Sequence, residues 1–170
     1  MQERNAKLMP KIEELKKLEK DGGVSEPLRK RFEDRANQIL AAGAAGFGEI
    51  AVHHLALRPG HPYESVPADH PLLLALADIA AGHDAIIDLH FDVVAEDSRI
   101  PAWGSPFDNP AELRANLPAF ERLLEHNRKA RIVWAHAGSD MLGFWTPALS
   151  RRLLAKHSNL YMSLRVDFGR

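Results

Sequence analysis

The sequence predicts an α/β fold built around a parallel sheet. Four short apolar runs alternate with helical segments along the chain, and buried strands that alternate with helices form parallel βαβ units. The segments after the first three runs are long, whereas those before the runs have only a few residues. The chain has 170 residues, of which 45% are hydrophobic, which is enough for one domain with its own core.

Each predicted element has a local signal in the sequence. The apolar runs predict strands over residues 46–52, 85–90, 131–136 and 159–165. Helical spacing, capping residues and first-turn prolines predict helices over residues 3–20, 25–43, 70–82, 109–129 and 146–157. Asp69 is the expected cap of the third helix, and Pro118 is expected to kink or restart the fourth. We therefore expect an N-terminal helix in residues 1–24 and an α/β domain in residues 25–170.

Composition excludes several classes of function. The chain has 22 basic and 23 acidic residues, so it offers no bulk charge to attract nucleic acid or an anionic membrane. The absence of cysteine excludes disulfides, thiolate nucleophiles and cysteine-ligated zinc. No run approaches the roughly 18 apolar residues that span a bilayer, and the charged N-terminus is unlike a secretory signal. We expect a cytoplasmic protein without nucleic-acid or membrane partners.

Three polar residues lie within or at the carboxyl end of predicted strands: Glu49, His90 and His136. Any one of them alone is more often a hydrogen-bonded structural residue. Strand ends of a barrel converge on one mouth, so three such residues on successive strands favour a shared site. Imidazole and carboxylate groups suit Zn²⁺, with Mn²⁺ or Fe²⁺ as alternatives, and a divalent ion activates a bound water.

Four further residues have two interpretations each or a weaker signal. Asp88 shares a strand face with His90, and either orients a ligand histidine or pairs with a basic residue. Trp103 and the other loop aromatics either line a pocket for a small-molecule substrate or cover the core. His53 is expected to touch that substrate from the loop. Arg165 either holds an anionic substrate group or forms an ion pair.

The strand segments resemble a known family. The runs that carry the resemblance are Ala45-Gly-Phe-Gly-Glu49-Ile, Ile87-Asp-Leu-His90, Ile132-Val-Trp-Ala-His136-Ala-Gly138 and Asn159-Leu-Tyr-Met-Ser163. They are similar to successive strands of the amidohydrolase superfamily, above all its amidohydrolase-related branch of TIM-barrel metal-dependent enzymes. The resemblance covers about residues 25–168. It implies a partial (β/α)₈ barrel of about four parallel βα units with extra N-terminal helices.

The resemblance also implies residue roles and a reaction. His90 matches a metal-binding histidine, and Glu49 matches an acidic metal ligand or its neighbour. His136 matches a catalytic histidine that binds a second ion or moves a proton. The implied reaction is hydrolysis, in which metal-activated water attacks an amide, ester or lactone carbonyl. A metal-dependent decarboxylase of the same fold is the nearest alternative.

The sequence departs from the family pattern in two places. It has no His-x-His pair of the kind that opens these barrels, and Gly138-Ser139-Asp140 follows the wrong strand to supply the last-strand aspartate. Asp167 is not equated with that aspartate either. Since a full barrel needs about 250 residues, the sequence resembles the middle of one. A non-catalytic half-barrel, which covers its sheet edges by forming a homo-oligomer or with its N-terminal helices, is therefore a further hypothesis.

Overall fold

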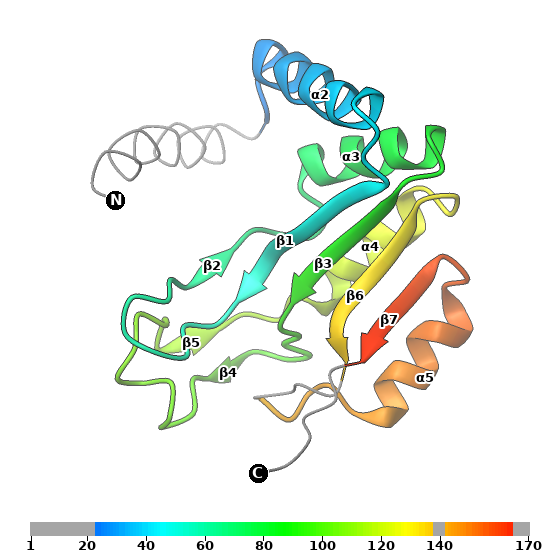
Figure 1. The fold of residues 1–170 in the computed structure, drawn as a ribbon. Coiled ribbons are helices and arrows are strands. Elements are labelled where there is room, and N and C mark those ends of the chain that lie inside the picture. Colours follow the sequence, from blue (N-terminus) through cyan, green and yellow to red (C-terminus); the bar gives the residue numbers. More distant parts are fainter. Residues whose placement is uncertain (1–22, 138–141, 165–170) are drawn as a thin grey trace.

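The computed structural model describes residues 23–137 and 142–164 and has a five-stranded, mostly parallel sheet (Figure 1). The strand order is β2-β1-β3-β6-β7. The parallel strands are β1 (Gly46–His54), β3 (Ile86–Phe91), β6 (Arg131–Ala137) and β7 (Leu160–Leu164), and the short β2 (Glu64–Ser65) runs antiparallel to β1. The four parallel strands confirm the four strand predictions, with bounds that differ by two residues at most.

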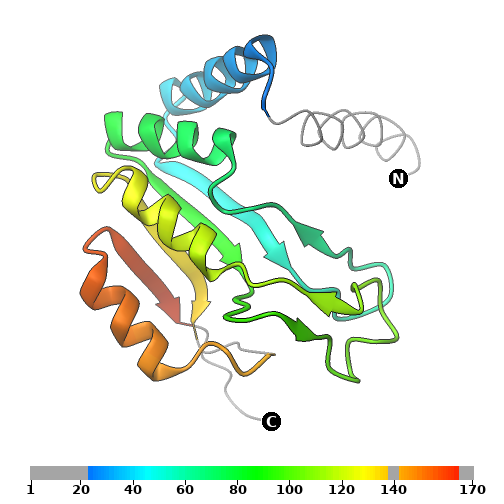
Figure 2. The same cartoon turned by 180° about the vertical axis from the view of Figure 1, so that it is seen from behind.

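Four helices accompany the sheet in the described residues: α2 (Glu26–Ala41), α3 (Pro71–Gly82), α4 (Leu117–His126) and α5 (Pro147–Lys156). Helices α3, α4 and α5 lie on one face of the sheet, and α2 packs beside α3 (Figures 1 and 2). The opposite face carries no helix in the part of the chain that the structure describes. The predicted α/β class is confirmed, and the sheet is open.

Two predictions about the helices were wrong. The α3 cap is His70, whose Nδ1 accepts from the Leu72 amide, whereas Asp69 accepts from Arg122. No helix begins at Asn109, because Glu112–Leu113 form strand β5, which pairs with β4 (Ser98–Arg99). Helix α4 begins after Asn116 with Pro118 in its first turn, so the helix starts there and is neither kinked nor restarted at Pro118. The helix predicted at residues 3–20 lies outside the described residues.

The core lies between the sheet and helices α3 to α5. Because strand residues alternate between faces, Ile87, Leu89 and Phe91 of β3 are all buried on the helix side. Trp134 of β6 is fully buried, with its ring centroid 5.2 Å from that of Phe120 on α4. Full burial of one such side chain stabilises the fold by about 1.5–3 kcal/mol, so this layer fixes the position of the strands.

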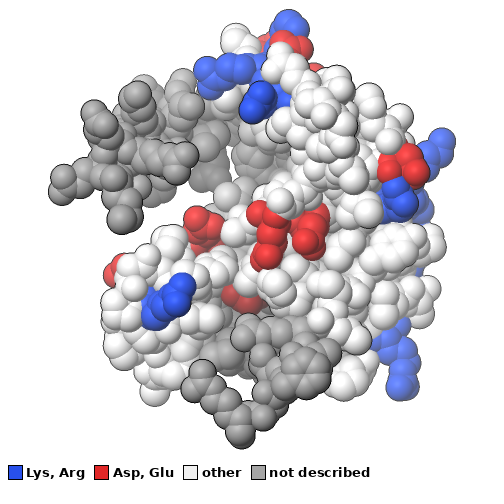
Figure 3. All heavy atoms as spheres, in the orientation of Figure 1, with Lys and Arg blue, Asp and Glu red and all other residues white. Residues whose placement is uncertain are grey.

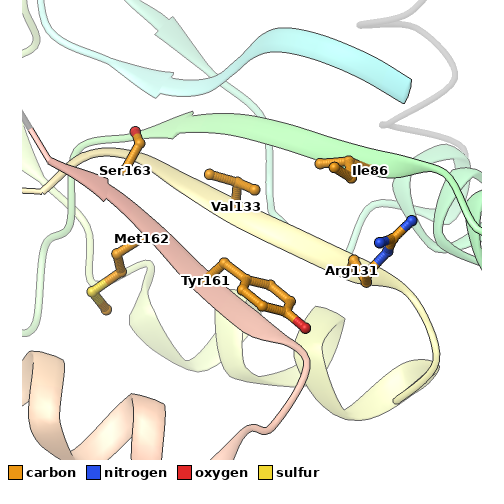
Figure 4. A pocket seen from close by; sticks show the side chains of 6 residues that line it. All are labelled: Ile86, Arg131, Val133, Tyr161, Met162 and Ser163. Carbon is orange, nitrogen blue, oxygen red and sulfur yellow. The ribbon is translucent and has the colours of Figure 1, made fainter. Parts of the chain in front are cut away.

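The face without helices has a shallow hollow of about 250 Å³ (Figure 4). Its lining residues are Ile86, Arg131, Val133, Tyr161, Met162 and Ser163. Arg131 is already bound to the backbone oxygen and the carboxylate of Asp84. The hollow therefore offers a mainly apolar wall, and the titratable residues of interest lie farther along the strands.

Candidate metal centre

A bulge in β1 places Glu49 on the helix-free face. Phe47 pairs with Ile87 and Ile50 pairs with Leu89, so Gly48 and Glu49 both lie opposite Asp88. A Cβ at Gly48 would lie 2.6 Å from the Cβ of Asp88, so the close approach requires glycine. The extra residue turns Glu49 toward the strand β3 side chains that face away from the helices.

A second irregularity, in β6, places His136 on the same face. Trp134 pairs with Met162 and the next pair is Ala137 with Leu164, so the register shifts at His136. His136 has a φ of 66°, an uncommon conformation for a residue with a side chain. Its amide donates to Ser163 Oγ at 3.1 Å. Simple alternation would direct His136 to the same side as the buried Trp134, and the bulge directs it to Glu49 instead.

Glu49, His90 and His136 converge on one point. Glu49 Oε1 lies 2.8 Å from His90 Nδ1 and 3.0 Å from His136 Nε2. The three candidate ligand atoms lie within 4.8 Å of one another, on three neighbouring strands. His90 and His136 lie near the carboxyl ends of β3 and β6, whereas Glu49 lies in the middle of β1. Their side chains are 38%, 20% and 41% exposed, respectively, so an ion can reach them from solvent. The donor set of one carboxylate and two imidazoles fits a divalent transition metal.

The pKa values reflect this clustering. Burial alone would raise the pKa of Glu49, but hydrogen bonds from His90 and His136 outweigh it and lower that pKa below its usual value. Burial likewise opposes charge on His90, yet the hydrogen bonds and charges of Asp92 and Glu49 raise the pKa of His90. Acidic side chains are also visible at the middle of this face (Figure 3). The centre therefore favours bound cations, whether protons or metal ions.

Asp92, which sequence reasoning missed, is the second carboxylate beside His90. Asp92 Oδ2 lies 3.5 Å from His90 Nε2 and accepts from the Leu55 amide at 2.8 Å. The sequence spacing could have indicated Asp92, because it follows His90 by two residues just as Asp88 precedes His90 by two. Asp88 itself has a buried Oδ1 with no hydrogen-bond partner among the described residues. Burial and the charge of Glu49 raise its pKa.

A hollow of about 270 Å³ adjoins the centre. It is lined by Glu49, Ala51, His54, His61, Pro62, Glu64 and His90. The ring of His54 lies 4.6 Å from that of His90 and 4.3 Å from that of His61, measured between centroids. A small molecule held beside Glu49 and His90 would meet these two imidazoles and the carboxylate of Glu64.

The predicted substrate contacts lie elsewhere or outside the described residues. His53 is only 3% exposed, and its Nδ1 lies 2.6 Å from the backbone oxygen of Asp92, so the structure places it behind the centre as a support. Trp103 packs against the small loop core of Leu55, Val94 and Leu113 rather than lining this hollow. Arg165 lies outside the described residues.

A second acidic group with a histidine lies on the helix side of the sheet, where Glu121, Glu125 and His157 meet. The ammonium of Lys156 lies 2.6 Å from Glu121 and 2.8 Å from Glu125. Arg152 also bonds Glu121 at 2.9 Å. Since Lys156 and Arg152 already neutralise the two carboxylates, Glu49, His90 and His136 form the better metal centre.

Comparison with known proteins found no matching family model, no matching curated protein and no matching solved structure. Among the described residues, no helix is both long and apolar enough to cross a membrane.

Proposed function

We propose that this protein is a metal-dependent hydrolase of the amidohydrolase type, with Glu49, His90 and His136 as its metal ligands. The observation that carries the proposal is the convergence of two imidazoles on one carboxylate oxygen, at 2.8 and 3.0 Å. Two backbone bulges produce this convergence, and strained or bulged backbone concentrates at functional sites. Zn²⁺ suits the donor set best, and Mn²⁺ or Fe²⁺ are alternatives.

The fold supports a partial (β/α)₈ barrel as the scaffold. In the described residues, parallel strands carry helices on one face only, whereas open doubly wound sheets carry them on both. The helix-free face then corresponds to a barrel interior. His90 and His136 lie near the carboxyl ends of β3 and β6, the end of the strands at which barrel enzymes place their active sites.

Each residue of the centre has its own role in the proposed reaction. A bound divalent ion would supply Lewis acidity that lowers the pKa of water and polarises a carbonyl. Glu49 and His90 hold the ion, with His90 braced by Asp92 on its far side. His136, the most exposed of the three, binds the ion or transfers a proton between solvent and substrate. The hollow beside His54 and His61 receives the substrate, an amide, ester or lactone.

Zinc binding by the purified chain tests the ligand assignment. We expect close to one zinc per chain after reconstitution, measured by elemental analysis. His90→Ala and Glu49→Gln should weaken zinc binding at least 100-fold in competition with a chromophoric chelator. His126→Ala is the matched control, because His126 contacts Asp78 on the opposite side of the sheet and should leave affinity unchanged. Less than a tenth of an ion per chain would refute the metal centre.

Activity assays test the reaction class. We expect the zinc-loaded chain to hydrolyse members of a panel of lactones, aryl esters and anilides, and His136→Ala to abolish turnover. Release of CO₂ from carboxylic acids without hydrolysis would assign a decarboxylase instead. Zinc binding with neither reaction would favour the non-catalytic half-barrel.

A further inference from the structure

The ring of His90 lies between two carboxylates. Its Nδ1 is 2.8 Å from Glu49 Oε1, and its Nε2 is 3.5 Å from Asp92 Oδ2. An imidazole that ligates a metal through one nitrogen carries its proton on the other. If Nδ1 faces the metal beside Glu49, the proton on Nε2 points at Asp92.

Asp92 is held in place from several directions. Its Oδ2 accepts from the Leu55 amide at 2.8 Å, and its own amide donates to the His53 carbonyl at 2.8 Å. Its backbone oxygen accepts from Asn116 Nδ2 at 3.0 Å and from His53 Nδ1 at 2.6 Å. These bonds come from His53 in β1, from Leu55 directly after it and from Asn116, the residue before α4. The Leu55 amide holds the Asp92 carboxylate, and the Asp92 backbone is fixed relative to two separate segments of the chain.

His53 and Tyr63 extend the contacts that hold Asp92. His53 Nδ1 donates to the Asp92 carbonyl, so its Nε2 is an acceptor, and the Tyr63 hydroxyl lies 3.4 Å away from it. The ring of His53 meets that of Tyr63 edge-on, with centroids 5.6 Å apart. Burial lowers the pKa of His53, which keeps its ring neutral and suited to this donor–acceptor role. A continuous chain of contacts thus leads from Tyr63 through His53 and Asp92 to His90.

We propose that Asp92 is a positioning residue that fixes His90 as the Nε2–H tautomer, with Nδ1 directed at the metal, and that His53 and Tyr63 brace Asp92. This inference rests on the proposed metal centre of Glu49, His90 and His136. It assigns to Asp92 the role that sequence reasoning considered for Asp88. Asp88 lies on the same face but has no hydrogen bond to His90 among the described residues.

Asp92→Asn and Asp88→Asn form a matched pair that tests this role. Both remove one carboxylate from the same face, but only Asp92→Asn weakens the acceptor of the His90 Nε2 proton. Loss of such a partner lowers metal affinity about 10–100-fold, so we expect that loss for Asp92→Asn and a change below about 3-fold for Asp88→Asn. Tyr63→Phe, which removes one distant hydroxyl, should give a smaller loss in the direction of Asp92→Asn. Equal zinc affinities for Asp92→Asn and Asp88→Asn would overturn the proposal.

The tautomer gives a readout that a purely structural role would not change. In ¹⁵N-histidine spectra of the zinc-loaded wild type, His90 should show a protonated Nε2 and a metal-bound Nδ1. A metal-bound Nε2 would overturn the proposal without any variant, so misfolding of Asp92→Asn cannot mask the result. A wild type that binds no zinc refutes the proposed function and this inference together. A wild type that binds zinc through Nε2 refutes this inference alone.

Discussion

Gly48→Ala tests whether the β1 bulge is what places Glu49 at the centre. The added Cβ would lie 2.6 Å from Asp88 Cβ and 3.0 Å from Asp88 O. Favourable carbon contacts lie at about 3.5–4.0 Å, so the overlap is about 1 Å. The nearest atoms belong to backbone or to a Cβ next to it, and they cannot rotate away. The strand β1 or strand β3 must therefore move.

Two effects destabilise the Gly48→Ala variant. Overpacking of this kind costs about 1–3 kcal/mol, and a φ of 155° adds backbone strain of about 1–3 kcal/mol for a residue with a side chain. We expect Gly48→Ala to lower the free energy of unfolding by about 2–6 kcal/mol. The measurement is urea unfolding followed by circular dichroism, with the midpoint and slope fitted separately. Because the displacement moves Glu49, zinc affinity should fall as well.

Gly82→Ala is the control for this experiment. Gly82 is the last residue of α3, and a Cβ there would meet nothing within 4 Å. Alanine at such a site changes stability by about 1 kcal/mol or less. A Gly48→Ala variant whose stability lies within 0.5 kcal/mol of that of Gly82→Ala would refute the reasoning about the bulge.

Two further predictions concern the core and the pH dependence. Trp134 is fully buried, donates through Nε1 to the Phe91 carbonyl at 2.8 Å and stacks on Trp145 at 3.9 Å between centroids. Trp134→Ala should therefore lower the free energy of unfolding by about 3–5 kcal/mol, measured by thermal unfolding. An unchanged melting temperature would contradict this account of the core. In metal-free protein, the pKa of His90 is raised above 6.5, so the stability it contributes is fully present below pH 6.5 and is lost as pH rises through the folded-state pKa. The difference in unfolding free energy between wild type and His90→Gln, measured with a chelator present, should therefore shrink between pH 6 and pH 9. A difference that grows over this range would contradict the raised pKa of His90.

Local signals in the sequence were sufficient for the parallel strands and for most helix bounds. A short apolar run or a first-turn proline determines structure within a few residues of itself, so β3 and α5 could be predicted from local sequence alone. The prediction was wrong for residues 109–116. There, Asn116 bonds to the Val94 amide and the Asp92 carbonyl, which are distant in sequence, and this pairing decides the local structure.

The sequence by itself also determined which polar residues stand within or at the end of the strands, because Glu49 lies inside an apolar run and His90 and His136 end theirs. Only the tertiary structure decided that they meet. Strict alternation does not bring Glu49 and His136 to one point; the bulges at Gly48 and His136 do, and bulges depend on how neighbouring strands pair. The choice of Asp92 over Asp88 beside His90 was likewise decided by contacts from two distant segments, at Leu55 and at Asn116. Such contacts link residues far apart in the chain, and no local pattern encodes them.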